Sequence, residues 1–146
     1  MSKYAKVKSM KSKHQKLSAS QKKFLKDMRI GVVYLFGSQA EGFATPLSDV
    51  DLGIVFQDSA IVYSNTNEIY TKLYSFFTDL FPGQKVDIVF LQRAGLELRF
   101  DAISHGIVLF EVSPDFRLDF EEHTTNSYLD FKPILREFNR VLIENA

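Results

Sequence analysis

Three aspartates and a glycine-serine turn are the residues of this chain whose types and spacing could do chemistry. Gly37 and Ser38 follow an apolar run, and ten residues separate Ser38 from the pair Asp49 and Asp51. Side chains two apart in an extended strand point to the same face, so both carboxylates project together. At ~4 Å their repulsion amounts to about 1–4 kcal/mol, depending on the dielectric. A divalent cation relieves that repulsion, and Mg²⁺, which binds a few carboxylates together with substrate phosphates, is the natural occupant.

A third carboxylate, Asp87, stands in the otherwise apolar run "KVDIVFL" at 85–91. Polar side chains in such a run are rarely there for packing. If the strands that hold Asp51 and Asp87 are neighbours, the acids form a cluster that can hold two metal ions ~3.5–4 Å apart, one activating the attacking hydroxyl and one stabilising the leaving oxygen. We therefore predict Asp49, Asp51 and Asp87 to be catalytic residues and ligands of Mg²⁺.

The glycine-rich turn is the candidate nucleotide-binding segment. Glycine at position 37 lets the backbone approach a phosphate closely, and Ser38 adds a hydroxyl and an N–H group. A short helix starting there would direct its positive end at the anion. Gly42 permits a second tight turn. The segment is not a Walker A loop, because no lysine follows the glycines. We predict that Gly37, Ser38 and Gly42 bind the nucleotide.

The elements that must position these residues alternate between strands and helices. Apolar, β-rich runs predict strands at 31–36, 49–56, 85–91 and 107–112. Helical spacing of apolar residues and helix-start residues predict helices over 20–29, 66–80 and 92–106, and from 114 onwards. Such alternation is typical of an α+β, or α/β-like, domain built around one sheet.

Helix ends can also be predicted from local residues. Ser18 or Ser20 can cap the first helix, and Asn65 with Glu68 resembles a capping box at the start of the second. Pro133 lies within the last helical pattern, where it removes a hydrogen-bond donor. We therefore expect a break immediately before Pro133.

The totals indicate one compact globular domain. The chain has 146 residues, of which 45% are hydrophobic, and it contains no cysteine, which excludes disulfides, thiolate metal sites and a cysteine nucleophile. No apolar run approaches the roughly 18 residues that span a bilayer, and the N-terminus lacks the apolar region of a signal peptide. We expect a soluble, cytoplasmic protein with no membrane partner.

Charge is unevenly distributed along the chain. Residues 1–29 hold ten of the 18 Lys and Arg residues but one of the 18 acids, so the remainder is acidic. An acidic body is a poor binder of nucleic acid, because phosphate contacts supply most of that affinity. We expect residues 1–19 to form a disordered basic leader, the one segment that could touch nucleic acid, and residues 20–146 to form a single folded domain.

The motifs together resemble the signature of the DNA polymerase β-like nucleotidyltransferase superfamily: Gly-Ser, ten residues, Asp-x-Asp and a later Asp on a strand. The forms "GSQAEG" and "SDVDL", with the later "LRFDAISHGIVLFE" and "YLDFKPIL", resemble the minimal nucleotidyltransferase (MNT) branch. The resemblance covers roughly residues 30–140. It implies a polymerase β-like fold, a mixed β-sheet flanked by helices, and transfer of a nucleoside monophosphate from a triphosphate with release of pyrophosphate.

Carried over by position, the resemblance implies roles for single residues. Asp49 and Asp51 would be metal ligands, and Asp87 would complete the site and help to deprotonate the acceptor hydroxyl. Gly37 and Ser38 would hold the triphosphate. Members of the branch are often encoded beside HEPN-domain ribonucleases and transfer AMP from ATP to a tyrosine of that toxin. The implied activity is thus protein adenylyltransfer by an antitoxin, with ATP as substrate, two Mg²⁺ ions as cofactors and a HEPN toxin as partner.

Two other functions fit the sequence. The protein could neutralise a partner by steric occlusion, with a vestigial site, although the three carboxylates are all present. It could also transfer a nucleotide to a small molecule such as an aminoglycoside. Enzymes of that kind usually carry an additional helical region for substrate, for which this chain leaves little room.

Overall fold

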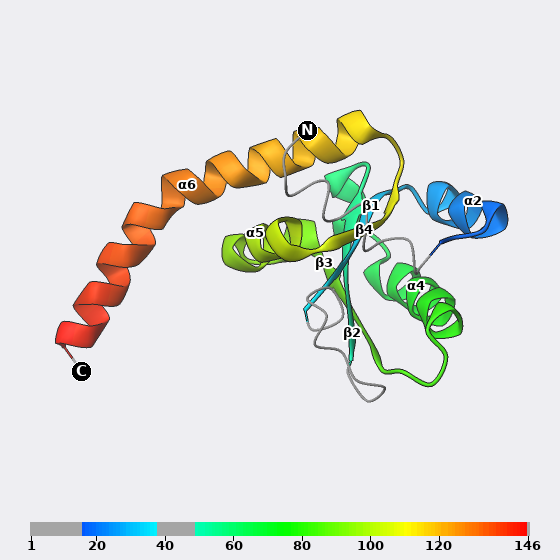
Figure 1. The fold of residues 1–146 in the computed structure, drawn as a ribbon, viewed down its shortest axis with the longest axis horizontal. Coiled ribbons are helices and arrows are strands. Elements are labelled where there is room, and N and C mark those ends of the chain that lie inside the picture. The colour runs from blue at the N-terminus through cyan, green and yellow to red at the C-terminus, as the bar shows by residue number, and fades with distance from the viewer. Residues whose placement is uncertain (1–15, 38–48, 146) are drawn as a thin grey trace.

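The computed structural model describes residues 16–37 and 49–145, and its centre is a four-stranded sheet with helices on both faces (Figure 1). The strands are β1 (Ile30–Phe36), β2 (Val50–Phe56), β3 (Val86–Phe90) and β4 (Ile107–Glu111). Their order across the sheet is β3-β2-β1-β4. β1 is antiparallel to both of its neighbours, whereas β2 and β3 are parallel. The predicted α+β fold with a mixed sheet is confirmed.

Four α-helices and two short 3₁₀ helices connect and cover the strands in the described part of the chain. The α-helices are α2 (Ala19–Asp27), α4 (Thr66–Leu80), α5 (Leu96–His105) and α6 (Pro114–Glu144), and the 3₁₀ helices are η2 (Ser59–Tyr63) and η3 (Leu91–Arg93). η2 has no counterpart among the predicted elements. The single helix predicted over 92–106 is divided into η3 and α5, because Gly95 in extended conformation separates them. None of the described helices is long and apolar enough to cross a membrane.

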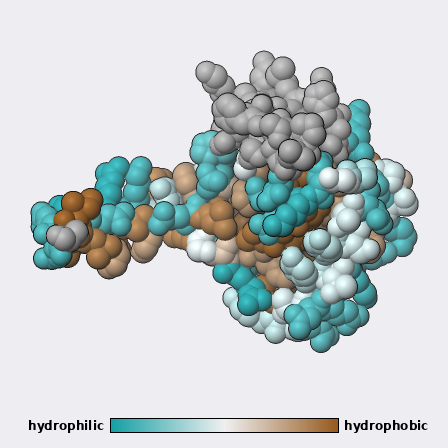
Figure 2. Space-filling model, turned by 90° about the horizontal axis from the view of Figure 1, so that it is seen from below, coloured by the Kyte–Doolittle hydropathy of each residue, from teal (hydrophilic) through white to brown (hydrophobic). Residues whose placement is uncertain are grey.

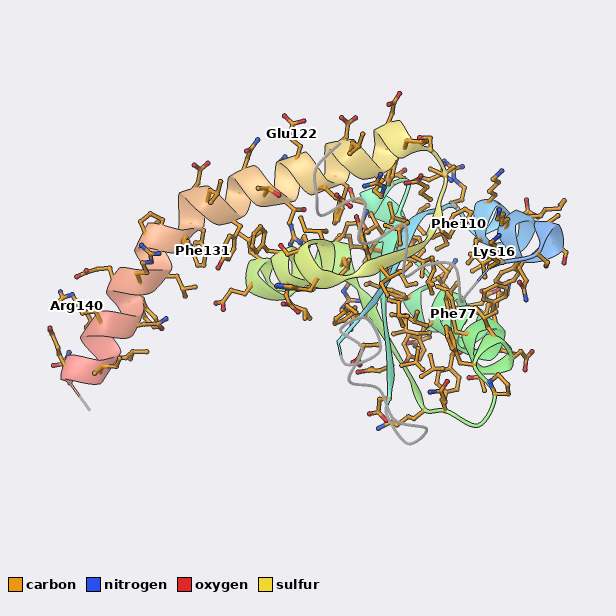
Figure 3. The ribbon with its side chains drawn as sticks, in the orientation of Figure 1. Lys16, Phe77, Phe110, Glu122, Phe131 and Arg140 are labelled. Atoms are coloured by element: carbon orange, nitrogen blue, oxygen red, sulfur yellow. The ribbon has the colours of Figure 1, made fainter. Side chains whose placement is uncertain are left out.

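One face of the sheet packs against α2 and α4 and is apolar throughout. Val33 and Leu35 of β1 and Leu52 and Ile54 of β2 point into this layer. The helices contribute buried side chains to it, among them Leu25, Leu73 and Phe77 (Figure 3). This layer is the larger of the two hydrophobic clusters, and its burial is the main favourable term in folding.

The opposite face packs against α5 and the first half of α6. Val32, Tyr34 and Phe36 of β1 lie here, because the side chains of a strand alternate between its two faces. Irregular register at the start of β1 brings Gly31 under α6, where a Cβ atom would come within 2.2 Å of the Phe116 ring. Only a glycine allows the helix to approach the strand so closely.

The start of α2 confirms one of the two predicted caps. The Ser18 side chain accepts a hydrogen bond from the Gln21 N–H, and the Gln21 side chain accepts one in return from the Ser18 N–H, so the two form a capping box. Leu17, just before it, is buried in the core against α2 and α4. The packed part of the chain therefore includes residues on the N-terminal side of α2.

The second helix starts after Asn65 as predicted, but its predicted capping box and the break predicted before Pro133 are wrong. Asn65 adopts a left-handed conformation with φ 42° and makes no capping hydrogen bond through its side chain, and Glu68 forms an ion pair with Lys72 at 3.2 Å instead. Pro133 does not break α6, which continues from Pro114 to Glu144 and bends (Figure 1). A proline inside a helix removes one backbone hydrogen bond and kinks the axis, but good helix formers on either side can keep the helix continuous.

Candidate active site

The pairing of β2 with β3 brings two of the predicted carboxylates side by side. In this parallel pair Asp51 is the direct partner of Asp87. The register is fixed at the same end of the strands by a 2.8 Å hydrogen bond from the Val50 N–H to the Lys85 carbonyl. Val50 and the other even-numbered residues of both strands point into the α4 layer. The two carboxylates therefore share the opposite face of the sheet, at the end where β2 and β3 begin.

The electrostatic environment of Asp51 reflects its acidic neighbours. Partial burial raises the pKa of Asp51, and the negative charges of Asp87 and then Asp49 raise that pKa further. Asp49 lies one residue before β2, and both Asp49 and Asp87 are exposed. A carboxylate that is hard to ionise because other carboxylates surround it is stabilised by a cation. The donor set, three hard oxygen-bearing side chains, suits Mg²⁺.

The three acids interact without forming a closed cage. Within residues 16–37 and 49–145, no group of three or more Asp, Glu, His or Cys side chains is close enough together to hold a metal ion. Charges influence a pKa over longer distances than those at which ligands bind one metal ion. The raised pKa of Asp51 therefore agrees with the absence of a three-ligand group among the described residues. Mg²⁺ often takes only one or two carboxylates from a protein and completes its shell with water and substrate phosphate. The acidic pair at the sheet edge is compatible with that mode of binding.

Gly37 lies directly against this acidic pair. It follows the last residue of β1, Phe36, which pairs with Asp51 across the sheet. Its φ of +73° favours glycine, and a Cβ atom added there would come within 2.4 Å of the Asp51 Oδ2 atom. The backbone of β1 thus turns away at the point where it touches the carboxylate. Ser38 and Gly42, the other predicted nucleotide-binding residues, lie outside the described residues.

A second polar group on the same face of the sheet escaped the sequence analysis. The Tyr34 hydroxyl donates a 2.7 Å hydrogen bond to the Glu121 carboxylate of α6, and Arg117 pairs with both Glu121 and Glu111 of β4. Burial and the Glu121 charge hold the pKa of Tyr34 well above its ordinary value. The signals that could have revealed it are a tyrosine inside the apolar run "GVVYLF" and opposite charges at i, i+4, Arg117 and Glu121, in the last predicted helix. This group fastens α6 to the sheet and does not reach the acids in any described contact.

A mixed sheet with adjacent aspartates at its edge and a glycine turn against them defines the class of nucleotidyl-transferring proteins. The chain belongs to the family "Polymerase beta, Nucleotidyltransferase", whose sequence model matches residues 20–115. This stretch contains all the strands, Gly37 and the three acids, and it excludes most of α6. Among curated proteins, none matches the chain significantly.

Solved structures with the same fold come from toxin-antitoxin complexes. A chain of a toxin-antitoxin with AMP-PNP is 24% identical, with a TM-score of 0.64 over 87% of this chain and 99% of that one. A chain of the tri-AMPylated Shewanella oneidensis HEPN toxin in complex with MNT antitoxin is 20% identical, with a TM-score of 0.56 over 93% and 98%. A chain of the MntA-HepT complex is 18% identical, with a TM-score of 0.54 over 86% and 99%. At these identities, the likeness is one of fold.

Proposed function

We propose that this nucleotidyltransferase transfers AMP from ATP to a tyrosine hydroxyl of a HEPN-domain toxin, and that it acts as the antitoxin of that protein. The observation that carries the proposal is the pairing of Asp51 with Asp87 against the Gly37 backbone. The structures of similar fold support it, because one contains an AMPylated HEPN toxin and another contains the ATP analogue AMP-PNP. The proposal assigns catalysis and metal binding to Asp49, Asp51 and Asp87, and nucleotide binding to Gly37, Ser38 and Gly42.

The reaction is a displacement at phosphorus. The tyrosine oxygen attacks the α-phosphorus of ATP, the bond from that phosphorus to the oxygen bridging to the β-phosphate breaks, and pyrophosphate leaves. In our proposal Asp87, the more exposed member of the pair, accepts the proton of the attacking hydroxyl. Gly37 allows the Asp51 carboxylate to lie against the β1 backbone, in the space that a Cβ atom would take, and its own backbone can approach the triphosphate closely. Two Mg²⁺ ions held by Asp49, Asp51 and Asp87 would neutralise charge on the phosphates when bound.

Transfer of label from ATP to the toxin tests this function. The purified chain is incubated with α-³²P-labelled ATP, Mg²⁺ and the HEPN-domain protein, and the toxin is analysed by mass spectrometry for the gain of AMP units and for the modified residue. We expect label on a tyrosine with the wild-type chain and none with Asp51→Ala. Label that persists in that variant, or a wild-type chain that leaves the toxin unmodified, contradicts the proposal.

A second candidate is inhibition of the toxin by occupancy alone. It is favoured by one observation, that the described part of the chain contains no group of acids ready to hold a metal ion. The combined variant Asp49→Ala, Asp51→Ala, Asp87→Ala separates the two functions. If this triple variant still binds the toxin and fully protects cells from it, occupancy suffices, whereas loss of protection with retained binding supports transfer.

A further inference from the structure

The first half of α6 has an apolar face that the rest of the molecule covers. Phe116 and Phe120 pack against the hydrophobic layer beneath α5. About two turns further on, the Tyr128 ring stacks on Phe100 of α5 with ring centroids 4.0 Å apart and nearly parallel planes. Beyond that pair α5 has ended, and α6 leaves the body of the protein (Figure 1). The remainder of the helix projects as an arm.

The same face continues along the arm, where no described part of the chain covers it. Its apolar residues recur every three or four positions, which places them on one side of a helix. They form what we call the outer apolar face: Phe131 (38% exposed), Ile134 (64%), Phe138 (60%), Val141 (40%) and Leu142 (54%). Figure 2 shows hydrophobic residues among hydrophilic ones along the projecting arm. In Figure 3, Phe131 lies on the side of α6 toward α5, and Arg140 lies on the outer side.

The arm has features of a surface that is meant to be covered. Soluble proteins rarely expose contiguous large apolar groups unless another molecule packs on them. The projecting part of α6, from about residue 131 to its end, is short enough that it would be only marginally stable as an isolated helix in water. Arg140, on the outer side, binds both Glu137 and Glu144, but ion pairs between fully exposed groups are screened by solvent and contribute little to stability. Most of the stability of the arm must therefore come from a partner that buries the outer apolar face.

A second copy of the chain fits this face poorly. Two arms side by side in parallel would collide, because α5 occupies the same face of α6 next to the arm. If the two arms packed antiparallel, each flank of one outer apolar face would lie opposite the same flank of the other copy. One flank of the outer apolar face carries Asp130, Glu137 and Glu144, spaced seven residues apart. Glu137 and Glu144 share the single cation Arg140, so this flank keeps a net negative charge. Antiparallel pairing would therefore set acidic side chains opposite acidic side chains.

We propose that the outer apolar face binds an amphipathic helix of the protein that accepts the nucleotide, and that this helix has an apolar stripe flanked by Lys or Arg. The partner helix continues the packing that α5 begins, and its basic flank meets Asp130, Glu137 and Glu144. The identity of the partner rests on the function proposed above. The role of the arm is to hold the acceptor protein beside the nucleotidyltransferase body.

Two exposed apolar residues of the arm provide a matched test. Phe138→Asp places a charge in the centre of the outer apolar face, whereas Ile143→Asp places the same charge on a residue that is 77% exposed and points roughly 140° away around the helix. Full-length chains are mixed with the HEPN-domain protein, and affinity is measured by calorimetry. We expect Phe138→Asp to weaken binding about 30-fold or more, as for the centre of an interface, and Ile143→Asp to leave it nearly unchanged.

Further measurements on the same samples separate the arm from the active site. ATP binding by both variants should equal that of the wild type, and light scattering should give a monomer for the free chain. Equal affinity of Phe138→Asp and wild type for the HEPN-domain protein overturns the docking proposal, even where AMP transfer stands. Loss of binding by Phe138→Asp supports docking, even where the wild type transfers no AMP and the proposed function fails. A free wild-type dimer that Phe138→Asp dissociates assigns the face to a second copy and overturns the proposal.

Discussion

The two faces of the sheet use the same strands for different purposes. On the α4 side, β1, β2 and β3 present only apolar residues, which are almost completely buried. On the α5 side, the same strands present Tyr34, Asp51 and Asp87 among a smaller apolar set. Because side chains alternate along a strand, consecutive residues of β2 belong to different faces. Stability and chemistry are thus separated by one position in the sequence, and changes at neighbouring residues should have different consequences.

The largest expected effect is the loss of AMP transfer on replacing Asp51. Metal-assisted charge stabilisation is worth several kcal/mol in a transition state, so Asp51→Ala should lower kcat/KM by about 10³-fold or more. Its melting temperature should not fall, because removing one of three mutually repelling acids relieves strain. Initial rates and thermal melts on the same sample check this. If Asp51→Ala has a lower melting temperature than the wild type, Asp51 contributes to the stability of the fold and the prediction is wrong.

The neighbouring residue should behave in the opposite way. Leu52 is fully buried in the α4 layer, and Leu52→Ala should lower the free energy of unfolding by about 2–5 kcal/mol. Urea denaturation measures the loss. At a temperature where the variant remains folded, it should still transfer AMP. Transfer that fails in fully folded Leu52→Ala would show that the two faces are not independent.

Gly37 tests the contact between the β1 turn and the acids. In Gly37→Ala, holding an alanine in the left-handed conformation lowers the free energy of unfolding by about 1–2 kcal/mol. The added Cβ atom would also displace the Asp51 carboxylate. We expect a rate at least about tenfold lower, which corresponds to 1.4 kcal/mol. Gly83 is the matched control, since its φ is +77° and its added Cβ would meet nothing within 4 Å. Gly83→Ala should lose similar stability while keeping its activity, and equal losses of activity in both variants would contradict the contact.

Tyr34 tests whether the polar group under α6 belongs to stability alone. Tyr34→Phe removes the hydroxyl that donates to Glu121, and a hydrogen bond to a charged group contributes about 1.5–3 kcal/mol to folding. Because the Glu121 carboxylate keeps its contact with Arg117, we expect the loss in the free energy of unfolding to lie near the lower end of that range. Chemical denaturation measures it, with rates of transfer as the control. A change in the pH-rate profile of Tyr34→Phe would instead link this group to the site.

The smallest expected effect is on stability as a function of pH. Because the pKa of Asp51 is raised in the folded state, its favourable contribution is complete below the ordinary pKa of an aspartate and is lost as pH rises through the raised value. Asp51→Asn should therefore match the wild type at acid pH and exceed it in stability at neutral pH. Mg²⁺ should stabilise the wild type more than the variant at neutral pH, by mass action. Parallel pH profiles for the two proteins would rule out this coupling.

Most of the sheet could be predicted from the sequence, because its strands are short apolar runs with a polar residue wherever a face is not buried. The spacing of Asp49 and Asp51 and the isolated Asp87 indicated the acidic site for the same reason. The pairing of Asp51 with Asp87 depends on contacts across the sheet that no local pattern specifies. Two local rules failed, namely the capping box at Asn65 and the helix break at Pro133. Asn65 had the residue type of a cap but not its backbone conformation, and α6 continued through Pro133.

The parallel pairing of β2 with β3 limits how this chain can change in evolution. Asp87 reaches its partner only because the turn at 82–85 enters β3 in one phase, with Val86 facing the core. Deletion or insertion of a single residue there would either strain the turn or place Asp87 on the apolar face of the sheet that packs against α4. Homologous chains should therefore vary in the amino acids of this turn, apart from the glycine at 83, and hardly at all in its length.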